Sequence, residues 1–171
     1  MPNYGDPSYW DKRYEEGAGQ MFDWLEDFSS MEPLFKDLIT HKSKILMVGC
    51  GNSLLSEDLY NHGYKNIYNM DISSVVIEQM KFRNKDRPEM MHHTMDCTKM
   101  DYPDAEFDIA IDKSTIDALL CGDSAFVNVA KMTKEISRVL KPGGKYLCIT
   151  YGNFKNRDEH FRRPFHSWHI K

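Results

Sequence analysis

The chain has 171 residues, 41% of them hydrophobic, and a formal net charge of −4, which suits one domain (1–171) built around a single core. Because Lys and Arg form no long run, nucleic acid is not expected as an obligatory partner. No apolar run reaches the roughly eighteen residues of a membrane span, and the first residues are polar, so neither membrane insertion nor secretion is expected. The four cysteines are scattered without a C-x-x-C pair, which favours free thiols, no metal site and a cytoplasmic or nuclear location.

Residues 1–43 are expected to form a helical lid region. Trp10 and Tyr14 are four residues apart and therefore share one face of a predicted helix. Trp24 follows shortly afterwards. These aromatic side chains either pack on the core or cover a cationic ligand, where cation–π attraction is worth roughly 0.5–2 kcal/mol. A second helix is predicted over residues 33–39, with Pro33 in its first turn.

Residues 44–53 have the pattern of a buried strand that turns sharply into a helix. The apolar run at 45–48 is typical of a central parallel strand covered on both faces. Gly49 and Gly51 would let the backbone approach a ligand closely, and Ser53 is placed to cap the helix that follows. This stretch is therefore the first candidate for a binding site.

A carboxylate follows the next predicted strand, at residues 66–70. Asp71 lies twenty residues beyond Gly51, where an acid at the end of the neighbouring strand holds the hydroxyl groups of a ribose. A dinucleotide site would carry a third glycine where this chain has Leu54. A nucleoside without a phosphate fits better, which points to S-adenosylmethionine.

Strands and helices continue to alternate along the chain. A helix is expected after Ser73 or Ser74, and another ends at a stop over residues 141–144. Further strands are predicted at residues 90–95, 107–111 and 146–150. The alternation predicts an α/β fold, a doubly wound and mainly parallel Rossmann-like sheet, with residues 44–151 as the cofactor-binding core.

Polar residues stand at the ends of several predicted strands. Because ligands of open α/β sheets bind at the carboxyl ends of the strands, Asp71, Asp96 and Asp112 are expected to converge. Asp96 would accept from an adenine amino group, and the Cys97 amide would meet a ring nitrogen. Aspartate is also simply common where strands become loops, but three acids beside a glycine-rich turn fit that alternative poorly.

These segments together resemble class I S-adenosylmethionine-dependent methyltransferases over nearly the whole chain. More narrowly, they resemble the eukaryotic methyltransferase-like group, of the endothelin-converting-enzyme-associated type, that modifies lysines of translation elongation factor 1-alpha. The matching segments are residues 9–14, 22–24, 45–53, 71–76, 94–96, 112–119 and 138–144. The resemblance implies cofactor contacts at Trp10, Tyr14, Trp24, Gly49, Asp71, Ile72, Asp96, Cys97 and Lys113.

The chain departs from that family in two places. The family usually has Lys-Gly-Thr where this chain has Lys113, Ser114 and Thr115. Its seven-stranded sheet ends in an antiparallel hairpin, and here the sequence stops about where the sixth strand would begin. Residues 152–171 are therefore expected to be a truncated tail. The exposed fifth strand should be covered by this tail or by another chain, which would allow self-association.

The resulting functional prediction is a protein-lysine methyltransferase that converts S-adenosyl-L-methionine to S-adenosyl-L-homocysteine. Asp112 is the predicted catalytic residue, orienting the amine or assisting its deprotonation, with Asp117 as a weaker second. Lys113 is expected to meet the cofactor's carboxylate or to hold Asp112. Two alternatives are a small-molecule acceptor and a cofactor-binding module that lacks turnover because the C-terminal strands are missing.

Overall fold

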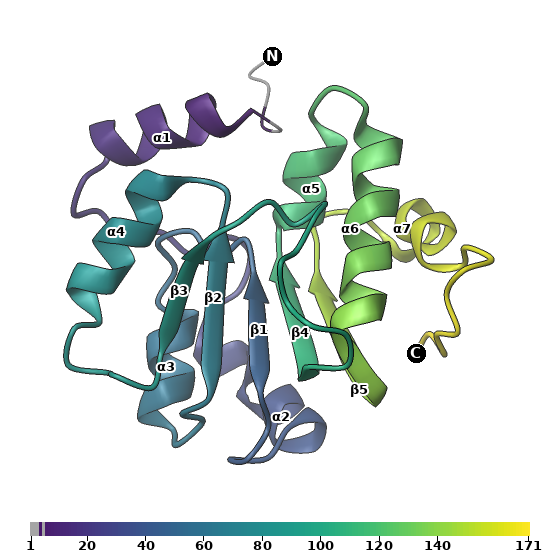
Figure 1. The fold of residues 1–171 in the computed structure, drawn as a ribbon, viewed down its shortest axis with the longest axis horizontal. Coiled ribbons are helices and arrows are strands. Elements are labelled where there is room, and N and C mark those ends of the chain that lie inside the picture. Colours follow the sequence, from purple (N-terminus) through teal and green to yellow (C-terminus); the bar gives the residue numbers. More distant parts are fainter. Residues whose placement is uncertain (1–3, 5) are drawn as a thin grey trace.

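The computed structural model describes residue 4 and residues 6–171, and its centre is a five-stranded parallel sheet. The strands are β1 (Ile45–Val48), β2 (Ile67–Asp71), β3 (Met91–Thr94), β4 (Phe107–Lys113) and β5 (Leu140–Ile149). Their order across the sheet is β3-β2-β1-β4-β5, and every pair is parallel (Figure 1). The order reverses between β1 and β4, so the topological switch point lies at the carboxyl end of β1. The predicted doubly wound α/β fold is confirmed.

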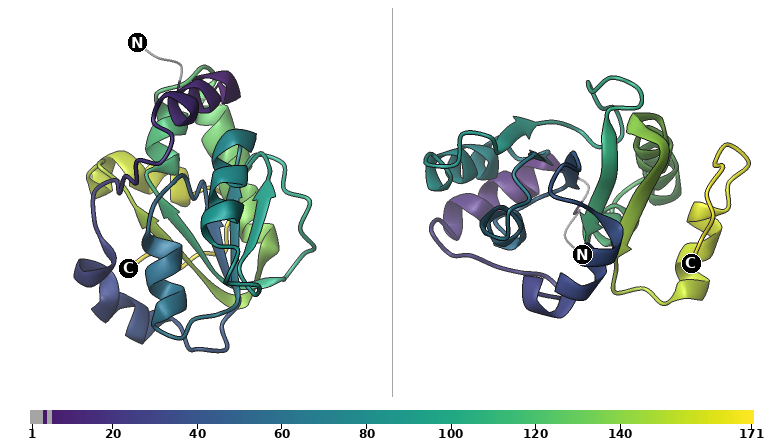
Figure 2. Two further views of the ribbon diagram at one scale, coloured as in Figure 1. Left: turned by 90° about the vertical axis from the view of Figure 1, so that its left-hand side faces the viewer. Right: turned by 90° about the horizontal axis from the view of Figure 1, so that it is seen from below.

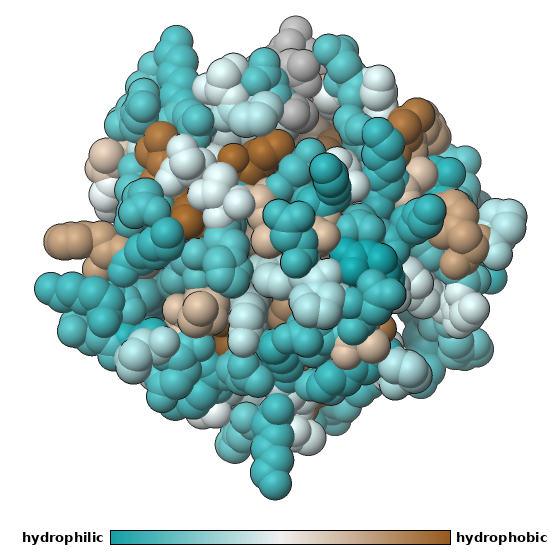
Figure 3. Space-filling model, viewed as in Figure 1, coloured by the Kyte–Doolittle hydropathy of each residue, from teal (hydrophilic) through white to brown (hydrophobic). Residues whose placement is uncertain are grey.

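Helices cover both faces of the sheet (Figure 2). One face carries α1 (Pro7–Glu16), α2 (Phe28–Leu38), α3 (Leu55–Asn61) and α4 (Ser74–Arg83), whose apolar side chains join Ile45 and Met47 in one cluster. The other carries α5 (Thr115–Leu120), α6 (Ala125–Val139) and α7 (Phe154–Phe161), which pack with Leu46 and Val48 in a second cluster. Alternate residues of β1 thus face opposite layers. On the face seen in Figure 3, hydrophilic residues dominate and hydrophobic ones occur in small separate groups. None of the described helices has the length and hydropathy that crossing a bilayer demands.

Helix α2 begins earlier than the sequence suggested. Asp27 caps it by accepting from the Ser30 amide at 3.0 Å, and Phe28 already packs into the core. Pro33 therefore lies inside the helix and not in its first turn. The prediction was wrong because the preference of proline for a first turn outweighed a weaker local signal, the aspartate cap.

Strand β5 also begins earlier than predicted. The helix α6 does end at Val139, but the backbone enters β5 directly at Leu140, so residues 141–144 belong to the strand and are not a separate stop. The register shifts between Phe107 and Ile109 of β4, which absorbs the extra residues as a bulge. Gly143 lies within it at a φ of 79°, a conformation that glycine adopts without strain.

The outer edge of β5 has no strand partner within the described part of the chain. The tail packs on one face of the strand, where the Tyr146 ring lies 5.8 Å from that of Phe161 and 5.4 Å from that of Trp168. The tail thus covers part of the fifth strand, as expected, without continuing the sheet (Figure 2). Self-association through the remaining edge stays a prediction.

Candidate functional site

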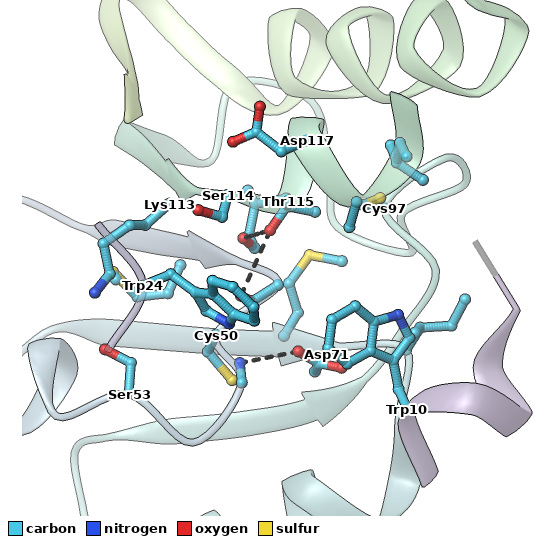
Figure 4. Close-up of a pocket in the computed structure, with 18 of the residues that line it drawn as sticks. Trp10, Trp24, Cys50, Ser53, Asp71, Cys97, Lys113, Ser114, Thr115 and Asp117 are labelled. Carbon is cyan, nitrogen blue, oxygen red and sulfur yellow. Dashed lines mark hydrogen bonds between the residues drawn. The ribbon is translucent and has the colours of Figure 1, made fainter. Parts of the chain in front are cut away.

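A cavity of about 500 Å³ opens at the carboxyl ends of β1, β2 and β4 (Figure 4). Its volume is in the range of small-molecule sites. The turn after β1, the end of β2, the end of β3 and the start of α5 all contribute to its wall. The cavity therefore occupies the position that the strand-end argument predicted.

The turn after β1 requires its glycines. Gly49 has a φ of 66° and Gly51 a φ of 52°, values that favour glycine. A Cβ at Gly49 would stand 2.1 Å from Oγ1 of Thr115, and one at Gly51 would stand 2.9 Å from the Tyr14 hydroxyl. Thr115 is itself fixed, since its Oγ1 donates to the Val48 carbonyl at 2.7 Å. Bare backbone thus forms this part of the cavity wall.

Asp71 lies at the end of β2 with its carboxylate against that turn. Its Oδ2 accepts from the Gly51 amide at 2.9 Å and its Oδ1 accepts from the Ser73 amide at 3.0 Å. Burial raises the pKa of Asp71, although these two amide hydrogen bonds oppose the rise. A carboxylate offers about four acceptor positions, so Asp71 retains capacity for ribose hydroxyls. The neighbouring Ile72 also lines the cavity.

The beginning of α3 differs from a phosphate site. The Leu54 amide donates to Oδ2 of Asp23 at 3.2 Å, and the Leu55 amide donates to Oγ of Ser53 at 3.0 Å. Ser53 accepts at the start of the helix, but Leu54 and not Ser53 occupies the cap position, so the predicted cap was one residue too early. Free amides at a helix start are what a pyrophosphate would need. Here a protein carboxylate already engages one of them, so that amide is not free for a phosphate.

Three aromatic side chains of the lid region, Trp10, Tyr14 and Trp24, line the cavity. The Trp10 and Tyr14 rings stack at 5.9 Å, and Nε1 of Trp10 donates to the Tyr4 carbonyl at 2.7 Å. Trp24 is 40% exposed, with the Arg13 guanidinium 5.5 Å from its ring centroid. The structure therefore brings these residues, far apart from β1 in sequence, to the same opening.

Asp96 and Cys97 line the cavity beyond the end of β3. Asp96 is exposed, and its Oδ1 accepts from the Thr98 amide at 2.8 Å. Burial, reinforced by the nearby carboxylates, raises the pKa of the Cys97 thiol. Cys97 is therefore a neutral group, and the contact of its backbone amide with a ligand stays a prediction.

Asp112, the predicted catalytic residue, does not lie in the cavity wall. Along β4, Ile111 and Lys113 line the cavity, whereas Asp112 is fully buried because side chains of a strand alternate between its two faces. Its carboxylate accepts from the Thr115 amide and from the Tyr146 hydroxyl, both at 2.8 Å. Burial raises the pKa of Asp112 to about 6, against these hydrogen bonds. The contacts assign Asp112 to holding the start of α5.

Lys113 does not hold Asp112 either. Its Nζ donates to Oδ1 of Asp23 at 2.6 Å and to the Glu26 carbonyl at 2.9 Å. Asp23 lies within the segment 22–24 that resembles the family, where only Trp24 was assigned a role. Its partner lies 90 residues away, and no local signal connects the two.

The remaining rim residues come from α5, α6 and the segment after β5. Asp117 lines the cavity, yet its Oδ1 accepts from Nη2 of Arg157 at 2.6 Å and its Oδ2 from the Tyr151 amide at 3.0 Å. Figure 4 shows this carboxylate directed away from Trp10 and Trp24. Cys121, Asn128 and Tyr151 complete the rim; they lie outside any motif, so sequence reasoning missed them. Within the described residues, no group of His, Cys, Asp and Glu is arranged to hold a metal ion.

The fold and the cavity define an α/β protein with a cavity of small-molecule size at its topological switch point. Residues 46–148 match the family model described as a methyltransferase domain. This match covers more than half of the chain, which therefore belongs to the methyltransferase domain family.

Curated relatives and solved structures agree with this assignment. The chain is 40% identical to the eEF1A lysine and N-terminal methyltransferase of Bos taurus, over 98% of this chain and 25% of that protein. It is 32% identical to the EEF1A lysine methyltransferase 4 of Mus musculus, over 98% of this chain and 69% of that protein. It thus spans about a quarter of the length of the first relative. A TehB-like SAM-dependent methyltransferase from Corynebacterium glutamicum has a similar fold, with a TM-score of 0.62 and 18% identity over 90% of this chain and 79% of that one.

Proposed function

We propose that this chain binds S-adenosylmethionine and transfers its methyl group to a primary amine of a protein. The observation that carries the proposal is the pair of carboxylates at the glycine turn. Asp71 is buried beside the turn, and Asp23 engages the start of α3. The first suits a ribose, and the second disfavours a phosphate. A nucleoside that bears no phosphate satisfies both.

The residues that line the cavity fit this nucleoside. Asp71 would accept the ribose hydroxyls, while Asp96 and the Cys97 amide would meet the adenine. The glycine turn would offer its backbone to the ligand, and a Cβ at Gly49 or Gly51 would collide with Thr115 or Tyr14. Trp10, Tyr14 and Trp24 would cover a sulfonium centre, which attracts aromatic faces. When bound, S-adenosylmethionine would supply an electrophilic methyl group.

The charge of the cavity favours a cationic acceptor. Its charged lining residues are Asp71, Asp96, Asp117 and Lys113. Lys113 is paired with Asp23 and Asp117 with Arg157, which leaves the carboxylates of Asp71 and Asp96. The wall is therefore net negative, which attracts amines and disfavours anions. Relatives named for lysine and N-terminal methylation of eEF1A support a lysine or N-terminal amine of an elongation factor as the acceptor. That acceptor would place the protein in the cytoplasm.

The chain's contribution to the reaction is mainly positioning. A lysine amine, with an ordinary pKa near 10.4, must lose its proton before it attacks. Asp112 lies outside the cavity wall and Asp117 is engaged by Arg157, so we assign the deprotonation to no carboxylate of this chain. The aromatic cover and the backbone wall hold the amine in line and limit water, which supplies much of the acceleration in such displacements.

The test is methyl transfer to purified eEF1A, read by mass spectrometry of its peptides. We expect mass increases of one or more methyl groups on a lysine or on the N-terminus. Matched reactions with an eEF1A whose labelled lysine is replaced by Arg locate the site. Methylation of small amines alone would replace the protein acceptor by a small molecule. Cofactor binding without any product would leave a binding module and overturn the enzymatic proposal.

A further inference from the structure

Residues 22–25, between α1 and α2, form one wall of the cavity. Phe22, Trp24 and Leu25 line it, and the Phe22 and Trp24 rings pack edge to face at 4.8 Å. Asp23 does not line the cavity. Figure 4 shows Trp24 between Lys113 and Ser53, the two residues whose side chains contact Asp23.

The Asp23 carboxylate connects three segments that are distant in the sequence. It accepts from Nζ of Lys113 at 2.6 Å, from the Leu54 amide at 3.2 Å and from the Ser53 hydroxyl. The Lys113 side chain is only 6% exposed and that of Asp23 22%. Burial alone would raise the pKa of Asp23, but these hydrogen bonds outweigh it and hold the pKa below its ordinary value. The carboxylate is thus ionised and paired.

The other half of the lid has different attachments. Asp11 of α1 accepts from the Ser73 hydroxyl at 2.6 Å, and Nε2 of Gln79 donates to the Tyr14 carbonyl at 3.0 Å. Both contacts bind α1 to the beginning and the outer side of α4, and they use no charged group of the cavity. Helix α1 is therefore held independently of the wall at residues 22–25.

The wall itself has few other attachments and one strained residue. Leu25 has a φ of 66°, a left-handed conformation that is unfavourable for a residue with a Cβ. The residues beside it are held by the bond from Nδ2 of Asn52 to the Gln20 carbonyl at 2.5 Å and by that from Nζ of Lys113 to the Glu26 carbonyl at 2.9 Å. The Arg13 guanidinium also lies over Trp24. Asp23 is the only charged side chain of residues 22–25. Its contacts with Lys113, Ser53 and Leu54 keep this strained segment against the cavity.

We propose that Asp23 is a positioning residue for the nucleoside site, because its ion pair with Lys113 holds the wall at residues 22–25 closed and must open for the ligand to enter and leave. The proposal rests on the proposed function, since the ligand is S-adenosylmethionine or its product. Residues 23 and 113 both belong to segments that resemble the methyltransferase family, and the ion pair gives these two segments one joint role.

The test is the rate of release of S-adenosyl-L-homocysteine, followed by tryptophan fluorescence in stopped flow. Asp23→Asn should raise the dissociation rate constant by roughly tenfold or more, the effect of losing about 1.4 kcal/mol. Asp27→Asn, which alters only the exposed cap of α2, is the matched control and should leave the rate unchanged. An unchanged rate in Asp23→Asn would overturn the proposal.

A second variant and a measurement on the unaltered protein complete the test. Asp23→Asn combined with Lys113→Gln leaves no unpaired buried charge, and it should also release the ligand faster. In the wild-type protein, hydrogen exchange of the amides at residues 20–26 should slow when the ligand is bound, whereas exchange in α1 should change little. Equal protection of both segments would contradict a separate closing wall. If the wild type does not bind S-adenosyl-L-homocysteine at all, the proposed function itself fails, whereas binding with an unchanged release rate in Asp23→Asn overturns only the role of Asp23.

Discussion

Asp112 offers a direct test of whether a buried carboxylate serves structure or chemistry. Its pKa is raised from an ordinary 3.8 to about 6 by burial. A group whose pKa is higher in the folded state stabilises the fold when protonated, and this stabilisation is lost as the pH rises through the folded pKa. The rise of the pKa from 3.8 to about 6 corresponds to a change of about 3 kcal/mol in the free energy of unfolding. Since Asp112 is fully buried, solvent screening reduces this figure little.

The perturbation is Asp112→Asn, which keeps an acceptor for the Thr115 amide and removes the titration. Urea unfolding of wild type and variant is compared from about pH 4 to about pH 8. The free energy of unfolding of the wild type, relative to the variant, should fall by about 2.5 kcal/mol across this range, because about 0.5 of the 3 kcal/mol is already lost at pH 4, where much of the unfolded carboxyl is ionised. Other carboxylates titrate equally in both proteins, so they cancel in the difference.

Two results would refute this account of Asp112. A difference that stays constant with pH would show that the carboxyl is not buried and titrating as described. If that constancy were accompanied by a large loss of turnover with unaltered affinity for S-adenosyl-L-homocysteine, Asp112 would return to the catalytic role that the sequence suggested.

Three further substitutions test the site and its surroundings. Ser114 has a φ of 71°, so Ser114→Gly should stabilise the protein by about 1 kcal/mol in urea unfolding. The control, Ser137→Gly within α6, should destabilise it by about 0.5 kcal/mol. A loss of stability in Ser114→Gly would contradict the backbone strain at this residue. Asp71→Asn should weaken calorimetric binding of S-adenosyl-L-homocysteine by about 1–3 kcal/mol, and unaltered affinity would remove Asp71 from the ribose. Gly49→Ala, whose Cβ would meet Thr115, should abolish this binding, and a variant that still binds would show that the turn tolerates a side chain.

The parts of the site that could be predicted are those that depend on local pattern. The apolar run of β1, the two glycines and Asp71 follow one another at spacings set by a single βαβ unit. The ends of β2 and β3 then bring Asp71 and Asp96 to the same opening. Lys113 also reaches it, because the carboxyl ends of parallel strands share one edge of the sheet.

The side of the sheet on which Asp112 lies could not be inferred in the same way. Both faces of β4 are buried, so Ile109, Ile111 and Ala110 give no polar alternation that would mark the face toward the cavity. The departure from Lys-Gly-Thr at Ser114 was visible in the sequence, but its cost became clear only from the φ of that residue.

The pairing of Asp23 with Lys113 lies beyond sequence reasoning for a different reason. The two residues are 90 positions apart, and each stands beside a more conspicuous neighbour, Trp24 or Asp112. Only the path of the chain from α1 to α2 across the cavity brings them together. Long-range ion pairs of this kind depend on tertiary structure, whereas a capped helix or a glycine turn depends on a few adjacent residues.

The cavity is proposed to take an adenosyl ligand without a phosphate. Calorimetric titration of the full chain with S-adenosylmethionine, S-adenosyl-L-homocysteine and NADH distinguishes these ligands. We expect low-micromolar or tighter binding of the first two and none of NADH, because Asp23 already engages the Leu54 amide at the start of α3 that a pyrophosphate would need. Binding of NADH at comparable affinity, or heat from none of the three ligands, would contradict this proposal.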